Sequence, residues 1–168
     1  ELLKLQKPLS KAADSEGPEH DEMLFIIIHQ SYELWFKQLI HEFNAAAKSL
    51  EAGDTHRSLA ILGRIRTILK VCVTQVDILE TMTPLQFNAF RGYLSSSSGF
   101  QSAQFRMVEA LLGRRDSKMA SHLPLDIQRE ITEISSLLNN AFLKYSKVYS
   151  NPFCIAKVLK CRCNRGSM

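Results

Sequence analysis

The sequence has few of the residues that interrupt regular secondary structure, with seven glycines and five prolines among 168 residues. That scarcity argues against a turn-rich β protein and favours long helices. No apolar run approaches the roughly 18 residues of a membrane span, and no signal-peptide pattern is present. From these absences we expect no membrane association and a cytoplasmic location.

Charge and cysteine spacing exclude further classes. The net charge is +4, and residues 157–165 alone supply four positive charges and no acid. A basic, solvated tail of this kind lacks the interleaved aromatics of a nucleic-acid-binding face, so we expect no nucleic-acid partner. The cysteines at positions 72, 154, 161 and 163 do not have the C-x₂-C spacing of a zinc site, and no H-E-x-x-H motif occurs. Cys72 lies in an apolar run and is predicted to be a core residue.

Apolar residues recur with the period of an α-helix, which predicts one helix over about 20–53 and a second over about 54–82. The first has two apolar faces, as expected for a helix buried on two sides. Thr83, Pro84 and Gln86 form a capping-box pattern that begins a short helix. Ser98 repeats the pattern and predicts a helix to about residue 112. A last helix is predicted from about 124 to 149.

The predicted fold is therefore all-α, with long antiparallel helices in a bundle. We divide the chain into a polar N-terminal segment (1–19), a helical domain (20–150) and a basic tail (151–168).

Two side chains within this pattern are candidates for chemistry. His29 shares a helical stripe with Phe25, Tyr32 and Phe36, and its spacing alone fits a core histidine as well as a site. Arg91 follows Phe90 in a short apolar helix, so it either binds a carboxylate ligand or pairs with an acid of the chain such as Glu80 or Glu109.

Other polar features favour structural roles on spacing alone. The serines at 95–98 followed by Gly99 form a permissive turn, for which helix capping is the simpler interpretation. The His20-Asp21-Glu22 sequence has three consecutive residues that do not face one another on a helix. It is interpreted as a helix start, where acids favour the helix dipole.

Several blocks of the sequence together resemble the tryptophan 2,3-dioxygenase family. The blocks are 20–30 (HDEMLFIIIHQ), 33–37 (ELWFK), 78–84 (ILETMTP), 90–91 (FR), 97–102 (SSGFQS) and 104–106 (QFR). The resemblance covers about residues 1–113 in the order of the family. It implies an all-helical haem dioxygenase fold and a homotetramer. It also implies haem b as cofactor, with L-tryptophan and O₂ converted to N-formylkynurenine, the first step of the kynurenine pathway.

The resemblance also implies roles for particular residues. His29 matches the distal histidine, which hydrogen-bonds the indole nitrogen and is the expected catalytic residue. Phe25 matches an aromatic of the distal pocket, and Arg91 matches the residue that binds the substrate carboxylate. The remaining implied positions are a pocket-lining residue, Phe87, and the turn beside haem and ligand, Ser98 and Gly99. On this resemblance Phe25, His29, Ser98 and Gly99 would also contact the cofactor.

The sequence departs from the family in one functional respect. The axial iron ligand of the family is a histidine in a later helix, and the only histidine after Arg91 here is His122, which does not match it. Residues beyond about 150 do not resemble the family either. We therefore expect no metal ligand in this chain. The alternative to an active dioxygenase is an inactive, truncated form that acts as a subunit-interaction module.

Overall fold

The structure is a computed structural model that describes residues 6–13, 17–94, 102–114, 121, 123–134 and 136. The elements are α1 (His20–Glu51), α2 (Thr55–Leu79), α3 (Pro84–Arg91), the 3-10 turn η2 (Gly92–Leu94) and α4 (Ala103–Leu111), and residues 125–134 are also helical. No strand occurs among the described residues, so the all-α prediction is confirmed. None of the helices within these ranges is long and apolar enough to cross a membrane.

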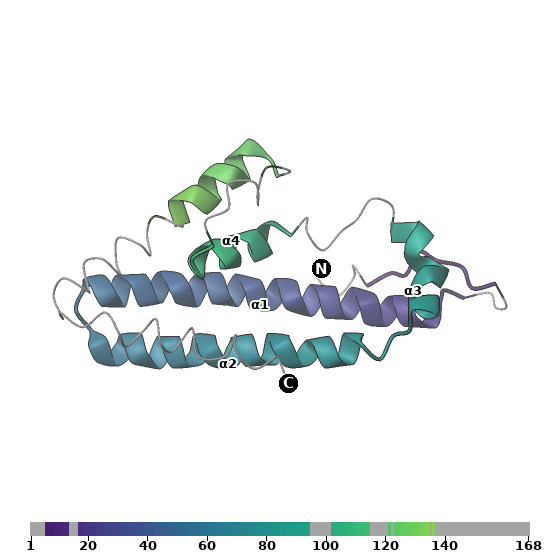
Figure 1. Ribbon diagram of the computed structural model, residues 1–168, viewed down its shortest axis with the longest axis horizontal. Coiled ribbons are helices and arrows are strands. Elements are labelled where there is room, and N and C mark those ends of the chain that lie inside the picture. The colour runs from purple at the N-terminus through teal and green to yellow at the C-terminus, as the bar shows by residue number, and fades with distance from the viewer. Residues whose placement is uncertain are drawn as a thin grey trace, which may run out of the picture.

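The two longest helices, α1 and α2, lie side by side and antiparallel (Figure 1). The connection between them is three residues long, and its last two residues are the glycine that ends α1 and the aspartate that caps α2. Gly53 adopts a φ of 76°, which favours glycine, and Asp54 caps α2 by accepting a hydrogen bond from the Arg57 N–H at 3.0 Å. The short connection forces the second helix back along the first.

The core lies where α1 meets both α2 and α4. On α2 the buried apolar residues follow the helical period and are Ile61, Ile65, Ile68 and Cys72. They form one buried cluster with Leu39 and Phe43 of α1, to which Met107 and Leu111 of α4 also belong. Helix α4 lies across α1 on the side away from α2 (Figure 1). The prediction that the first helix is buried on two sides, and that Cys72 is a core residue, is therefore confirmed.

Helix α3 begins with the predicted capping box and lies beside the N-terminal end of α1 (Figure 1). The Thr83 hydroxyl accepts from the Gln86 N–H at 3.3 Å, and the Gln86 side-chain oxygen accepts from the Thr83 N–H at 2.7 Å. Phe90, the penultimate residue of α3, is fully buried and packs against Phe25 of α1. This contact brings the end of α3 close to the first turns of α1.

Two predicted boundaries are wrong. Helix α2 ends at Leu79 rather than near residue 82, because the following N–H groups of Thr81 and Met82 turn to carbonyls three residues back. Helix α4 begins at Ala103, later than predicted, and is capped by Ser102, whose hydroxyl accepts from the Phe105 N–H at 3.0 Å. The predicted cap, Ser98, lies outside the described residues. The predicted last helix is described only over 125–134 and at 136, and the basic tail lies outside the described residues.

Candidate functional site

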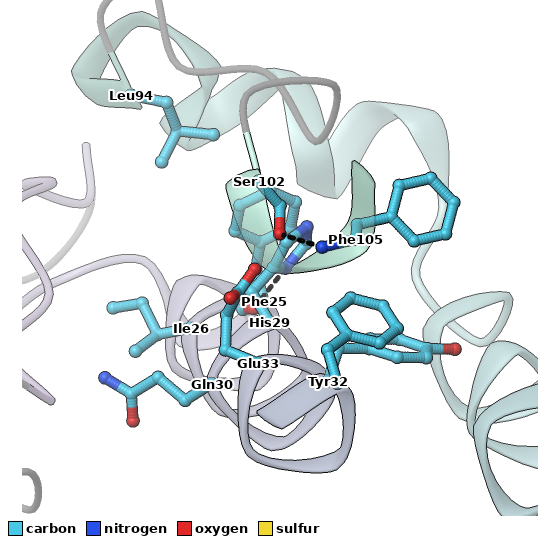
Figure 2. Close-up of a pocket in the computed structure, with 10 residues that line it drawn as sticks. Phe25, Ile26, His29, Gln30, Tyr32, Glu33, Leu94, Ser102 and Phe105 are labelled. Atoms are coloured by element: carbon cyan, nitrogen blue, oxygen red, sulfur yellow. Dashed lines mark hydrogen bonds between the residues drawn. The ribbon is translucent and has the colours of Figure 1, made fainter. Parts of the chain in front are cut away.

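A cavity of about 600 Å³ lies over α1, between the end of η2 and the start of α4. Its walls are mainly apolar and aromatic. The lining residues are Phe25, Ile26, His29, Gln30, Tyr32, Glu33, Phe36, Leu94, Ser102 and Phe105. Figure 2 shows His29 and Glu33 on the side of α1 that faces Ser102 and Phe105. A mostly apolar cavity with a few convergent polar groups is typical of a small-molecule site.

His29 is held in one orientation by the residue one turn earlier. Its Nδ1 atom lies 2.7 Å from the main-chain oxygen of Phe25, and the two rings are 4.0 Å apart. A carbonyl oxygen only accepts hydrogen bonds, so Nδ1 carries the proton and donates it. In the neutral ring, Nε2 then has a free lone pair. With Nδ1 occupied in this way, Nε2 of His29 can accept a hydrogen bond from a ligand that lies against the aromatic wall.

An aromatic cluster joins this wall to α3. The Phe25 ring centroid lies 5.6 Å from that of Phe87 and 5.5 Å from that of Phe90. Phe87 and Phe90 meet edge to face at 5.5 Å. Aromatic pairs at these distances contribute beyond their buried area. The structure thus brings Phe25, His29 and Phe87 together, although Phe87 is not among the residues that line the cavity.

Arg91 is the last residue of α3 and follows the buried Phe90. It is half-buried, and it does not line the cavity within the described part of the chain. Of the two acids considered as its structural partners, Glu109 forms ion pairs with Arg106 and Arg114. Arg91 is thus one residue from the aromatic cluster in sequence and is not among the residues that line the cavity.

The remaining predicted site residues, Ser98 and Gly99, lie outside the described residues. The nearest described residue on their C-terminal side is Ser102, which lines the cavity and caps α4.

Of two carboxylates with defined partners, Glu33 was not among the predicted site residues, and Glu22 was interpreted only as part of a helix start. Glu33 lines the cavity one turn after His29, and Gln104 of α4 donates a hydrogen bond to its Oε2 atom at 2.6 Å. Glu22 is only 2% exposed and accepts hydrogen bonds from the N–H groups of Leu9 and Ser10 at 2.8 and 2.9 Å. Glu33 had a local signal, since a carboxylate on an aromatic helical stripe is unusual. No local sequence pattern predicts the hydrogen bonds of Glu22 to Leu9 and Ser10.

Tyr32 closes the cavity toward α2. Its hydroxyl donates to the main-chain oxygen of Cys72 at 2.7 Å. Burial raises the pKa of Tyr32 above its usual value, and the nearby Cys72 and Asp77 add to the effect. Burial likewise raises the pKa of the Cys72 thiol. Both groups are therefore neutral at physiological pH, and they join α1 to α2 behind the cavity.

The resemblance implies haem, and the cavity meets only part of that requirement. Its aromatic and aliphatic walls are suited to packing against a flat macrocycle, but an axial donor on the iron is also needed. His29 is the sole imidazole among the lining residues that the structure describes. His20, His41 and His56 are exposed, and the described residues contain no cluster of three metal-ligating side chains. These residues fit the wall of a haem site and do not supply its axial ligand.

Comparison with known proteins agrees with this geometry. A model of the family described as tryptophan 2,3-dioxygenase matches residues 1–133. The tryptophan 2,3-dioxygenase of Herpetosiphon aurantiacus is 52% identical over 148 residues, which are 86% of this chain and 55% of that protein. The corresponding protein of Anaeromyxobacter dehalogenans is 54% identical over 126 residues, covering 75% of this chain and 45% of that protein.

The chain spans about half the length of the curated relatives it matches. The family match nevertheless covers α1, α2, α3 and α4, and with them all the described residues of the cavity. From the helical fold, the cavity and these matches together, the chain belongs to the tryptophan 2,3-dioxygenase family.

Proposed function

We propose that this chain forms the substrate-binding side of a tryptophan 2,3-dioxygenase. The reaction opens the indole 2,3-bond of L-tryptophan with O₂ and gives N-formylkynurenine. The observation that carries the proposal is the state of His29, whose Nδ1 is occupied by the Phe25 carbonyl so that Nε2 is left as an acceptor in an aromatic cavity. An indole has a single N–H donor on a flat apolar ring, which is the ligand that such a site favours.

In this proposal the residues of the chain act by binding and orienting the substrate. The indole ring packs against Phe25 and the other aromatic walls, and its N–H donates to Nε2 of His29. The carboxylate binds Arg91 at the end of α3, because a guanidinium can make two parallel hydrogen bonds to it. Phe87, Ser98 and Gly99 would complete the pocket. Holding both ends of the amino acid fixes the indole 2,3-bond, and positioning of this kind lowers the barrier.

Haem supplies the activation of O₂ in this family of reactions, and the protein supplies orientation and electrostatics. The described residues provide no axial ligand for its iron. As part of the same proposal, the protein acts in the cytoplasm as a homotetramer.

A second candidate is a subunit-interaction module without catalysis. It is favoured by one observation, which is that the described part of the chain offers no imidazole other than His29 to the cavity. The two candidates share the same tryptophan pocket but differ in haem uptake and turnover.

One experiment on the purified full chain separates them. The protein is reconstituted with haem, reduced, and supplied with L-tryptophan and air, while the Soret band and the absorbance of N-formylkynurenine are recorded. Calorimetric titration with L-tryptophan is run in parallel. Product formation supports the dioxygenase, whereas L-tryptophan binding without haem uptake supports the module. Absence of L-tryptophan binding in either form would contradict the pocket assignment itself.

A further inference from the structure

A hydrogen-bonded pair joins α1 to α4 at the cavity. The side-chain amide of Gln104 donates to Glu33 Oε2 at 2.6 Å and to the main-chain oxygen of Glu33 at 3.2 Å. A short hydrogen bond to a carboxylate is stronger than one between neutral groups. The two residues are 71 positions apart, so the pair fixes the place of one helix relative to the other.

The pair lies in the middle of the wall that α4 contributes. Ser102, two residues before Gln104, lines the cavity and caps the helix. Phe105, the next residue, also lines the cavity, and its ring packs 5.3 Å from that of Phe36 on α1. The wall residues therefore flank Gln104 on both sides. A shift of Gln104 relative to Glu33 would move both of them.

Glu33 is also one helical turn after His29, so both side chains lie on the same face of α1. The distance between α4 and Glu33 therefore also determines how much space lies between α4 and His29. Gln104 also stabilises Glu33 itself, because placing a carboxylate in an apolar wall costs free energy unless a donor hydrogen-bonds to it.

We propose that Glu33 and Gln104 are positioning residues, which set the distance between the first turn of α4 and His29 and so the width of the ligand site. Glu33 lines the cavity, but in this proposal it acts, like Gln104, by placing Ser102 and Phe105 and not by binding the ligand with its charge. The ligand used to test this, L-tryptophan, rests on the proposed function, whereas the positioning of α4 does not.

The competing account is that the negative charge of Glu33 contacts the ligand directly. A charge exchange separates the two accounts. Gln104→Glu places two carboxylates against each other and opens the pair. Combining it with Glu33→Gln restores one amide and one carboxylate in reversed order, with the charge moved to α4. A positioning role is recovered by the exchange, whereas a role that needs the charge at position 33 is not.

The matched control is Gln38→Glu. Gln38 donates to Glu42 at 2.7 Å, so this variant creates a similar pair of carboxylates on α1, away from the cavity. It measures the general effect of such repulsion on the folded protein.

Two measurements are made on the full chain. Amide hydrogen exchange is followed at Phe105 and Arg106, whose N–H groups bond to the hydroxyl and carbonyl oxygens of Ser102. Affinity for L-tryptophan is measured by calorimetry. Loss of a charged hydrogen bond predicts roughly a tenfold or larger effect on each in Gln104→Glu. The double variant is expected to recover most of both, and Gln38→Glu is expected to resemble the wild type.

Two outcomes would overturn the proposal. Unchanged exchange at Phe105 and Arg106 in Gln104→Glu would overturn the proposal. Exchange that recovers in the double variant without recovery of L-tryptophan affinity would overturn it as well, and would assign the charge of Glu33 to ligand binding. If the wild type binds no L-tryptophan, the proposed function fails, while the exchange measurement still decides whether the pair positions α4.

Discussion

The Nδ1 atom of His29 lies 2.7 Å from the main-chain oxygen of Phe25, within the same helix. In an α-helix that oxygen also accepts the main-chain N–H of residue 29, so its two lone pairs are both used by one residue. The ring contact between the same two side chains adds a second restraint. The orientation of the imidazole is therefore set by a single turn of α1, before any ligand enters.

This restraint predicts which ligands depend on His29. His29→Ala should lower the affinity for L-tryptophan by roughly two- to tenfold, the usual net contribution of one hydrogen bond. The affinity for 1-methyl-L-tryptophan should change little, since that ligand has no indole N–H to donate. Calorimetric titration of both ligands checks the difference. Equal losses for the two would show that His29 supports the pocket without accepting the indole hydrogen.

A second prediction concerns the other end of the amino acid. Arg91→Ala should weaken L-tryptophan binding by roughly tenfold or more, because a charge-assisted bidentate pair is lost. Tryptamine, which lacks the carboxylate, should lose far less. Arg91→Lys is the control, since it retains the charge without the planar pair of donors. Its affinity for L-tryptophan should lie between those of the wild type and Arg91→Ala. Parallel losses for both ligands, with a lower melting temperature, would assign Arg91 to the fold.

The helices could be predicted because their signals are local. The 3.6-residue period, Gly53, Asp54 and the Thr83 capping box each act within one or two turns. The boundaries that were wrong depend on choices between neighbouring candidates. Ser98 and Ser102 are both followed by possible partners, and the sequence does not tell which serine adopts the extended backbone of a cap.

The site could be predicted only in part for the same reason. The stripe of Phe25, His29 and Phe36 follows from helical spacing. The pair of Glu33 and Gln104 does not, because it depends on how α4 crosses α1, which is a tertiary contact between distant segments. Local patterns identify the face of the helix that forms the cavity but not the residues that hold the opposite wall.

The core offers a prediction about stability that is independent of ligand. Ile65→Ala should lower the free energy of unfolding by about 2–5 kcal/mol, since the side chain on α2 is only 2% exposed in the core shared with α1 and its loss leaves a cavity. Leu59→Ala on the same helix is the matched control, because Leu59 is 63% exposed, and it should change the value by less than about 0.5 kcal/mol. Urea unfolding followed by circular dichroism measures both. Similar effects at the two positions would contradict the packing of α2.

Glu22 holds the segment 6–13 against the start of α1, and its contacts predict a dependence on pH. Burial raises the pKa of Glu22, but the hydrogen bonds from Leu9 and Ser10 outweigh that effect and leave the pKa below its ordinary value of 4.5. A lowered pKa stabilises the attached segment at pH values above 4.5, and this contribution is lost as the pH falls through the folded value. The amide chemical shifts of Leu9 and Ser10 should therefore move toward unfolded values only as the pH falls below 4.5. Glu22→Gln should give Leu9 and Ser10 the amide chemical shifts of a detached segment already at neutral pH. The control is Asp21→Asn, which removes a neighbouring carboxylate that contacts His20 and should leave these shifts unchanged. Retention of the wild-type shifts in Glu22→Gln would show that the segment is held by other contacts.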